Sequence, residues 1–141
     1  GGVAKKMVSA DIDKSKEEVE NLSYNQSKER AISLYSNKKY VEALAIFDAI
    51  SRNRADNDTL AYYGSLCTFH LNRFNETIRT IAVLANNPKN VFYNQAKWYY
   101  ALALIGAEKE DDAIIVLEQI MQENSPYKDK AKNELKKLKL E

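Results

Sequence analysis

A short pattern occurs three times in this chain, and the repetition constrains the fold more than any other sequence feature. Each copy has a small residue at its centre and large apolar residues four and seven positions later. The three small residues are Ala43, Thr77 and Ala113, so successive copies are 34 and 36 residues apart. Apolar residues at this spacing lie on one face of a helix. A repeat of this length is typical of stacked helical hairpins, each burying its apolar face against its neighbours.

Capping and helix-breaking residues predict where the elements begin and end. Ser23 and Asp58 are candidate N-caps, Pro88 ends the second hairpin, and Ser125 with Pro126 starts the last helix. We expect a flexible lead with a possible short helix over 1–22, then one domain over 23–141 with hairpins at about 24–53, 58–86 and 90–123 and a capping helix over 126–139.

Composition excludes several classes of protein. The 141 residues carry 21 basic and 20 acidic side chains, so no net field favours a nucleic acid partner. A single cysteine excludes an internal disulfide, and few Gly and Pro favour long helices. No apolar run approaches the roughly 20 residues that cross a membrane. The chain begins with Gly1 and not with Met, so a signal peptide or membrane anchor upstream stays an open alternative.

These features resemble the tetratricopeptide repeat (TPR) family over roughly residues 24–123. In that family a small residue of the first helix packs against a small residue of the second. The resemblance therefore implies a second series of small residues, 12 positions before the first series: Ala31, Ser65 and Ala101. The family pattern also has an aromatic residue that opens the second helix, matched by Tyr40 and Phe74 but replaced by Glu110 in the third copy. Thr77 stands where the family usually has Ala. The resemblance implies an all-α fold: a right-handed superhelix of three antiparallel helical hairpins plus a C-terminal capping helix.

A looser resemblance concerns residues 96–103, 125–127 and 130–132. They are similar to repeat domains of bacterial envelope proteins that follow a single membrane-spanning helix. This likeness implies a membrane tether upstream and a domain that faces the periplasm. A cytoplasmic protein is the alternative.

The TPR resemblance implies protein or peptide binding in a concave groove lined by the first helix of each hairpin. Mapped by spacing, the groove-facing candidates are Lys28, Ile32, Tyr35, Tyr62, Leu66, Phe69, Trp98, Leu102 and Ile105. Some family members grip a C-terminal carboxylate with Lys and Asn one turn apart. Here Ile32 follows Lys28 in place of Asn, so we expect this clamp to be absent. The aromatic and aliphatic groove suits an amphipathic helix or apolar peptide.

Two of these positions leave alternatives open. Trp98 is either a packing residue or a groove anchor, because consecutive residues of a helix point in different directions. Of Tyr62 and Tyr63, we expect one to pack and the other to be available to a partner.

Other clusters have a plain structural interpretation. Cys67 and His70 lie three residues apart, but no further Cys or His completes a metal site, so we expect a packed thiol and a surface or groove histidine. The acidic residues 108–112 suit a solvated helix start, where the helix dipole favours them. The lysines of the last helix suit a solvated outer face.

The leading hypothesis is a non-enzymatic scaffold that binds a protein segment in its groove, with Tyr35, Tyr62, Phe69 and Trp98 as main contacts. No acid, base, nucleophile or metal set converges in the sequence, so we expect no enzyme activity, no cofactor and no metal. The alternative is a self-association module that forms homo-oligomers.

Overall fold

The computed structural model describes residues 21–52 and 57–140, and within these ranges every regular element is a helix. The predicted lead over 1–22 lies almost wholly outside the described residues. A first helical segment covers residues 21–36. It is followed by α2 (Tyr40–Ser51), α3 (Asp58–His70), α4 (Phe74–Ala85), α5 (Tyr93–Gly106), α6 (Glu110–Gln122) and α7 (Lys128–Leu140). The predicted fold class, three stacked hairpins and a final helix, is confirmed.

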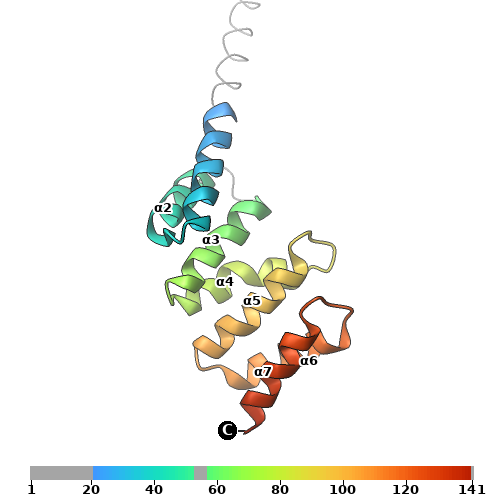
Figure 1. Cartoon of the computed structure of the whole chain (residues 1–141). Helices are drawn as coiled ribbons and strands as arrows, with labels where there is room; N and C mark the ends of the chain where they lie inside the picture. The colour runs from blue at the N-terminus through green and yellow to red at the C-terminus, as the bar shows by residue number, and fades with distance from the viewer. Residues whose placement is uncertain (1–20, 53–56, 141) are drawn as a thin grey trace, which may run out of the picture.

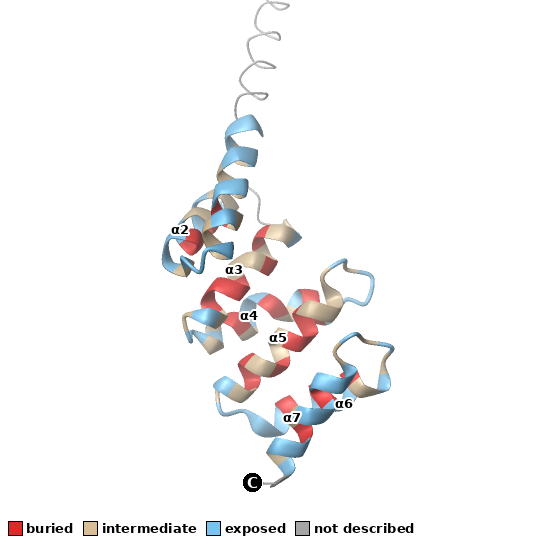
Figure 2. Ribbon diagram, viewed as in Figure 1, coloured by how far each residue is buried: buried red, intermediate tan, exposed pale blue. Residues whose placement is uncertain are grey.

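Each helix packs mainly on the helices next to it in sequence, from α2 to α7 (Figure 1). The small residues of both predicted series lie at the centres of these contacts. All six are fully or almost fully buried: Ala31, Ala43, Ser65, Thr77, Ala101 and Ala113. Buried residues gather where the helices face one another, whereas the connecting loops are exposed (Figure 2). The close approach predicted from the repeat is therefore present in each hairpin.

The turn inside each hairpin has the same conformation. One residue per turn adopts the left-handed region: Lys38 (φ 62°), Asn72 (φ 60°) and Glu108 (φ 61°). The next residue donates its N–H to a carbonyl five positions earlier, at 2.8–2.9 Å. This Schellman arrangement satisfies carbonyls at the end of the first helix and reverses the chain in three residues. The repeat thus extends to the turns, although none of the three positions is glycine.

Several predicted helix ends need correction. Ser23 does not begin the first helix, which already includes Asn21. The cap of α3 is Asn57 and not Asp58: its Oδ1 accepts a hydrogen bond from the Leu60 N–H at 3.2 Å. A short polar side chain can cap from either position, and only the backbone geometry distinguishes the two.

The third hairpin begins later than predicted because residues 88–92 form turns. The Asn90 side chain accepts a hydrogen bond from the Phe92 N–H at 2.8 Å, and the Asn90 N–H donates to the Asn87 carbonyl at 2.9 Å. Asn readily forms such local bonds, which compete with helix formation. Helix α5 therefore starts at Tyr93 and not near Asn90.

Helix α7 covers the last hairpin with one narrow apolar face. Ala131 and Leu135 are buried in the same core cluster as Leu117 and Ile120 of α6. Most of its lysines are exposed. An amphipathic terminal helix shields the open end of a stack of repeats.

Candidate functional site

Aromatic rings from all three hairpins meet on the first helices. We define the aromatic cluster as Tyr35 of the first helical segment, Tyr63, Phe69 and His70 of α3, and Tyr99 of α5. Ring centroids are 5.5 Å apart for Tyr35 and Tyr63, 6.0 Å for Tyr35 and His70, and 5.3 Å for Phe69 and Tyr99. These are ordinary distances for edge-to-face and tilted pairs. The tyrosines and Phe69 are half-buried and His70 is exposed, so the cluster offers ring surface to solvent.

The aromatic cluster is electrically neutral near pH 7. Burial raises the pKa of Tyr35 and of Tyr99 above the ordinary value of 10, with smaller contributions from neighbouring tyrosines. Burial, followed by the nearby Lys38 ammonium, lowers the pKa of His70 below 6.5. The His70 ring also stacks on Tyr40, with centroids 4.5 Å apart and planes 13° from parallel. A neutral, ring-lined surface favours apolar ligands over charged ones.

The structure divides the sequence-predicted site residues into two groups. The half-buried residues, which keep some surface for a partner, are Lys28, Ile32, Tyr35, Phe69, Leu102 and Ile105. Three others are core residues that a partner does not reach in this conformation: Tyr62 (8% exposed), Leu66 (2%) and Trp98 (9%). The open alternative at Trp98 is thereby decided for packing.

Tyr62 and Trp98 are buried by equivalent contacts. Each stacks on the aromatic residue just before the helix that follows its hairpin, α5 for Tyr62 and α7 for Trp98. The Tyr62 ring lies 4.4 Å from Phe92 with an interplanar angle of 10°, and Trp98 lies 5.6 Å from Tyr127 with an angle of 14°. Stacking of large rings buries much apolar area at each junction between hairpins. These two aromatics therefore hold the stack together.

The sequence predicted His70 as a surface or groove residue, and it is exposed, whereas spacing did not select Tyr99 and left Tyr63 undecided. Tyr63 and Tyr99 each directly follow a residue that the spacing selected. A helix face wide enough to carry a ligand covers more than one row of residues, so the neighbouring row contributes as well. The signal available in the sequence was that Tyr63 and Tyr99 are themselves aromatic.

A buried ion pair connects α5 to the segment after α6. Lys97 is only 7% exposed, and its Nζ lies 2.7 Å from Glu123 Oε1 and 2.8 Å from Tyr93 Oη. The Tyr93 hydroxyl also donates to Glu123 at 2.7 Å. Burial opposes both charges, but the hydrogen bonds outweigh it, so the pKa of Lys97 is raised and that of Glu123 is lowered. The three groups satisfy one another, which indicates a structural role.

Metal-binding groups do not gather in the described part of the chain. No group of three or more His, Cys, Asp or Glu there could hold a metal ion. Cys67 is fully buried, and burial, with a smaller effect of Asp48, raises the pKa of its thiol to about 12. Such a thiol is a packing group and a poor nucleophile. None of the described helices is long and apolar enough to cross a membrane.

Comparison with known proteins supports the fold. No family model matches the chain, and no curated protein matches it either. A crystal structure of the type III secretion translocator chaperone SycD of Yersinia enterocolitica, in an alternative dimer, is similar with a TM-score of 0.68. The match covers 83% of this chain and 92% of that chain at 15% sequence identity. At this identity the likeness shows a shared TPR-like helical fold.

Proposed function

We propose that this protein is a non-enzymatic TPR scaffold that binds an apolar protein segment through the aromatic cluster. The observation that carries the proposal is the set of half-exposed rings from three hairpins on one continuous surface. Tyr, Phe and Trp are enriched at the centres of protein interfaces, because they supply large contact area at low entropic cost. The similar structure is described as a chaperone, which agrees with capture of a protein segment.

The chemistry of the surface suggests the kind of segment. The aromatic cluster is neutral, and Ile32 and Leu102 add half-buried aliphatic area on the same first helices. The absence of Asn one turn after Lys28 disfavours a carboxylate clamp. An amphipathic helix or extended apolar stretch is therefore the ligand that this surface fits, with its side chains between the rings.

Site-specific photocrosslinking tests this proposal. A photoreactive phenylalanine analogue placed at Tyr99 or Leu102 should capture a protein in cells of the source organism. The same analogue at Val83 of α4 (75% exposed and apolar) is the matched control and should capture nothing specific. Equal adducts from both surfaces, or none from Tyr99 and Leu102, would refute the assignment.

Self-association is the second candidate function. The first helical segment extends beyond α2 in Figure 1, and Leu22 near its end is 59% exposed. The similar SycD structure is described as a dimer of that chaperone. Light scattering over a concentration range tests this candidate. A stable dimer, together with crosslinked adducts of twice the 16.1 kDa chain mass, would favour it over a foreign partner.

A further inference from the structure

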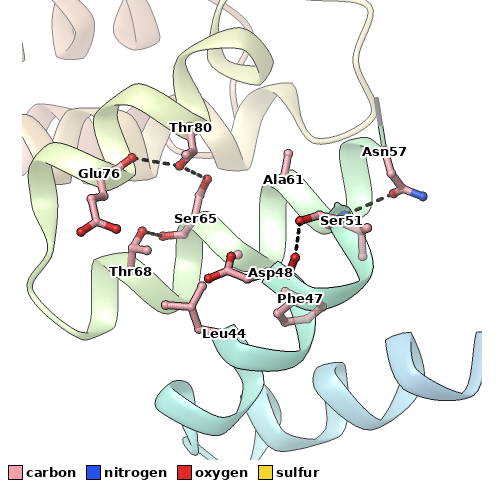
Figure 3. A pocket seen from close by; sticks show the side chains of 12 residues that line it. Leu44, Phe47, Asp48, Ser51, Asn57, Ala61, Ser65, Thr68, Glu76 and Thr80 are labelled. Carbon is pink, nitrogen blue, oxygen red and sulfur yellow. Dashed lines mark hydrogen bonds between the residues drawn. The ribbon is translucent and has the colours of Figure 1, made fainter. Parts of the chain in front are cut away.

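A cleft of about 390 Å³ lies between α2, α3 and α4 (Figure 3). None of the aromatic cluster residues lines it. Its walls come from Leu44, Phe47 and Asp48 of α2 and from Gly64 and Thr68 of α3, with α4 closing the far side. The volume is at the lower end of the roughly 300–1,000 Å³ typical of ligand sites. We call it the Gly64 cleft.

Gly64 keeps this space open. A Cβ added at this position would meet no atom within 4 Å. The equivalent positions of the other hairpins, 34 residues earlier and 36 later, are Arg30 and Tyr100, which have long side chains. Gly in the middle of a helix costs about 1 kcal/mol relative to Ala. The second hairpin therefore carries a destabilising residue where its counterparts place bulk.

The hydroxyl groups of the cleft need no ligand. Ser65 and Thr80 share a hydrogen bond of 2.7 Å, and Thr68 donates to the Ser65 carbonyl at 2.8 Å (Figure 3). Thr80 also donates to the Glu76 carbonyl at 3.0 Å. Because these groups are already paired, they do not attract a polar ligand strongly, and the recognition must come from other groups.

The charges of the cleft are acidic. Its lining contains the carboxylates of Asp48 and Glu76 and no Lys, Arg or His among the described residues. Glu76 is held by Arg73 through two hydrogen bonds of 2.7 and 3.0 Å. The Arg73 guanidinium also acts electrostatically on the Asp48 carboxylate, which lies beside the apolar side chains of Leu44 and Phe47 (Figure 3). One arginine thus faces two carboxylates, and the cleft keeps a net negative charge. A carboxylate next to an apolar wall is complementary to a basic side chain with a long aliphatic stem.

We propose that the Gly64 cleft is a second binding site, which takes a short peptide segment of a partner protein with Arg or Lys beside a large apolar residue. The cationic group pairs with Asp48, and its methylene groups lie over Gly64 and Phe47. The adjacent apolar side chain fills the remaining volume beside Leu44. The two surfaces share no residue, although Phe47 of the cleft stacks on Tyr63 of the aromatic cluster with ring centroids 6.0 Å apart, so the two proposals are tested by separate measurements.

Nuclear magnetic resonance offers a direct test, because the sequence has only four glycines and the amide signal of Gly64 is therefore readily identified. The probe is N-acetyl-Leu-Arg-Leu-amide, titrated to about 10 mM because so short a segment binds near the millimolar range. We expect a saturable shift of the Gly64 signal, with Gly106 unmoved as an internal control. The peptide with Glu in place of Arg should give no shift.

Three outcomes of the titration would overturn the proposal. They are no shift of Gly64 with the Arg peptide, equal shifts with the Glu peptide, and a Gly64 shift that follows protein concentration without peptide. The last outcome would identify a second copy of the chain as the occupant. A test of the aromatic cluster is unaffected by any of these results.

Variants then locate the bound peptide. With a fluorescein-labelled Arg peptide, Gly64→Leu should weaken binding at least about tenfold by filling the cleft, whereas Gly64→Ala should stay within about twofold. Asp48→Asn should weaken binding about two- to fivefold, because Asp48 is exposed and its ion pair is screened. Unchanged affinity in both Gly64→Leu and Asp48→Asn would refute the site. If Gly64→Leu does not fold, as judged by circular dichroism, the Asp48→Asn result decides.

Discussion

Thr68→Leu and Thr77→Ala should each destabilise the protein when made alone. The double variant should recover most of the stability that the single variants lose. The two hydroxyl oxygens lie 2.8 Å apart in the second hairpin, and both residues are buried. Thr68 donates to the Ser65 carbonyl, so its oxygen can accept from Thr77. The equivalent pairs are Leu and Ala in the first and third hairpins, at 34 and 43 and at 104 and 113. A polar pair has therefore replaced an apolar one at the same site.

The single replacements have separate costs. Thr77→Ala loses a buried methyl group (about 1 kcal/mol) and a hydrogen bond (about 1 kcal/mol), and regains about 0.5 kcal/mol of helix propensity, so the net loss is about 1.5 kcal/mol. Thr68→Leu adds bulk against the Thr77 methyl, at about 1–2 kcal/mol. It leaves the Thr77 hydroxyl with only the Arg73 carbonyl, at 3.2 Å.

The double variant removes both hydroxyls, and the Leu side chain fills the volume that the Thr77 methyl vacates. Replacement of both partners of a hydrogen bond by apolar groups of matching shape is nearly neutral. We expect a loss below about 1 kcal/mol and a coupling energy of about 2 kcal/mol, within the range for residues in contact. Urea unfolding of the four proteins measures this cycle. Additivity within about 0.5 kcal/mol would show that the two residues do not act as a pair.

Three further predictions concern the turns, the buried ion pair and the core. Glu108→Gly should stabilise the protein by about 1 kcal/mol in urea unfolding, because Gly adopts the positive φ of this position without strain. Asn72→Gly should stabilise it by less, since Asn tolerates this region. Equal gains from the two variants would contradict the argument. Burial raises the pKa of Glu123, but the hydrogen bonds from Lys97 and Tyr93 outweigh burial and lower this pKa below 4.5. The ionised Glu123 therefore stabilises the fold fully above pH 4.5, and this stabilisation is lost as the pH falls through the folded-state pKa. Unfolding curves at several pH values should show this loss in the natural chain but not in Glu123→Gln. Trp98→Ala should cost about 3–5 kcal/mol in thermal unfolding followed by circular dichroism, whereas a loss below about 1 kcal/mol would mark a surface residue.

The fold could be predicted because local and repeated signals agree. The small residues at 31 and 43, at 65 and 77 and at 101 and 113 are buried as the repeat and the TPR resemblance predict, and the hairpin turns recur at 38, 72 and 108. Helix ends were predicted less well, because Ser, Asp and Asn can cap from neighbouring positions. At Asn57 and Asn90 the backbone conformation decided between them.

The candidate surface could be predicted only in part. Spacing places Tyr35, Phe69 and Leu102 on the first helices, and the structure keeps them half-exposed. It places Tyr62 and Trp98 there too, but Phe92 and Tyr127 cover them. The covering residues come from connections about 30 positions away in sequence, so no periodicity within one helix reveals them.

The sequence by itself determined which residues pair within each hairpin, because helix periodicity and the repeat act over short separations. The tertiary structure alone decided which faces stay open. Burial of Lys97 against Glu123 and the empty space above Gly64 both depend on how successive hairpins approach one another. That approach is set by packing across many side chains at once, and it leaves no signal in any single segment.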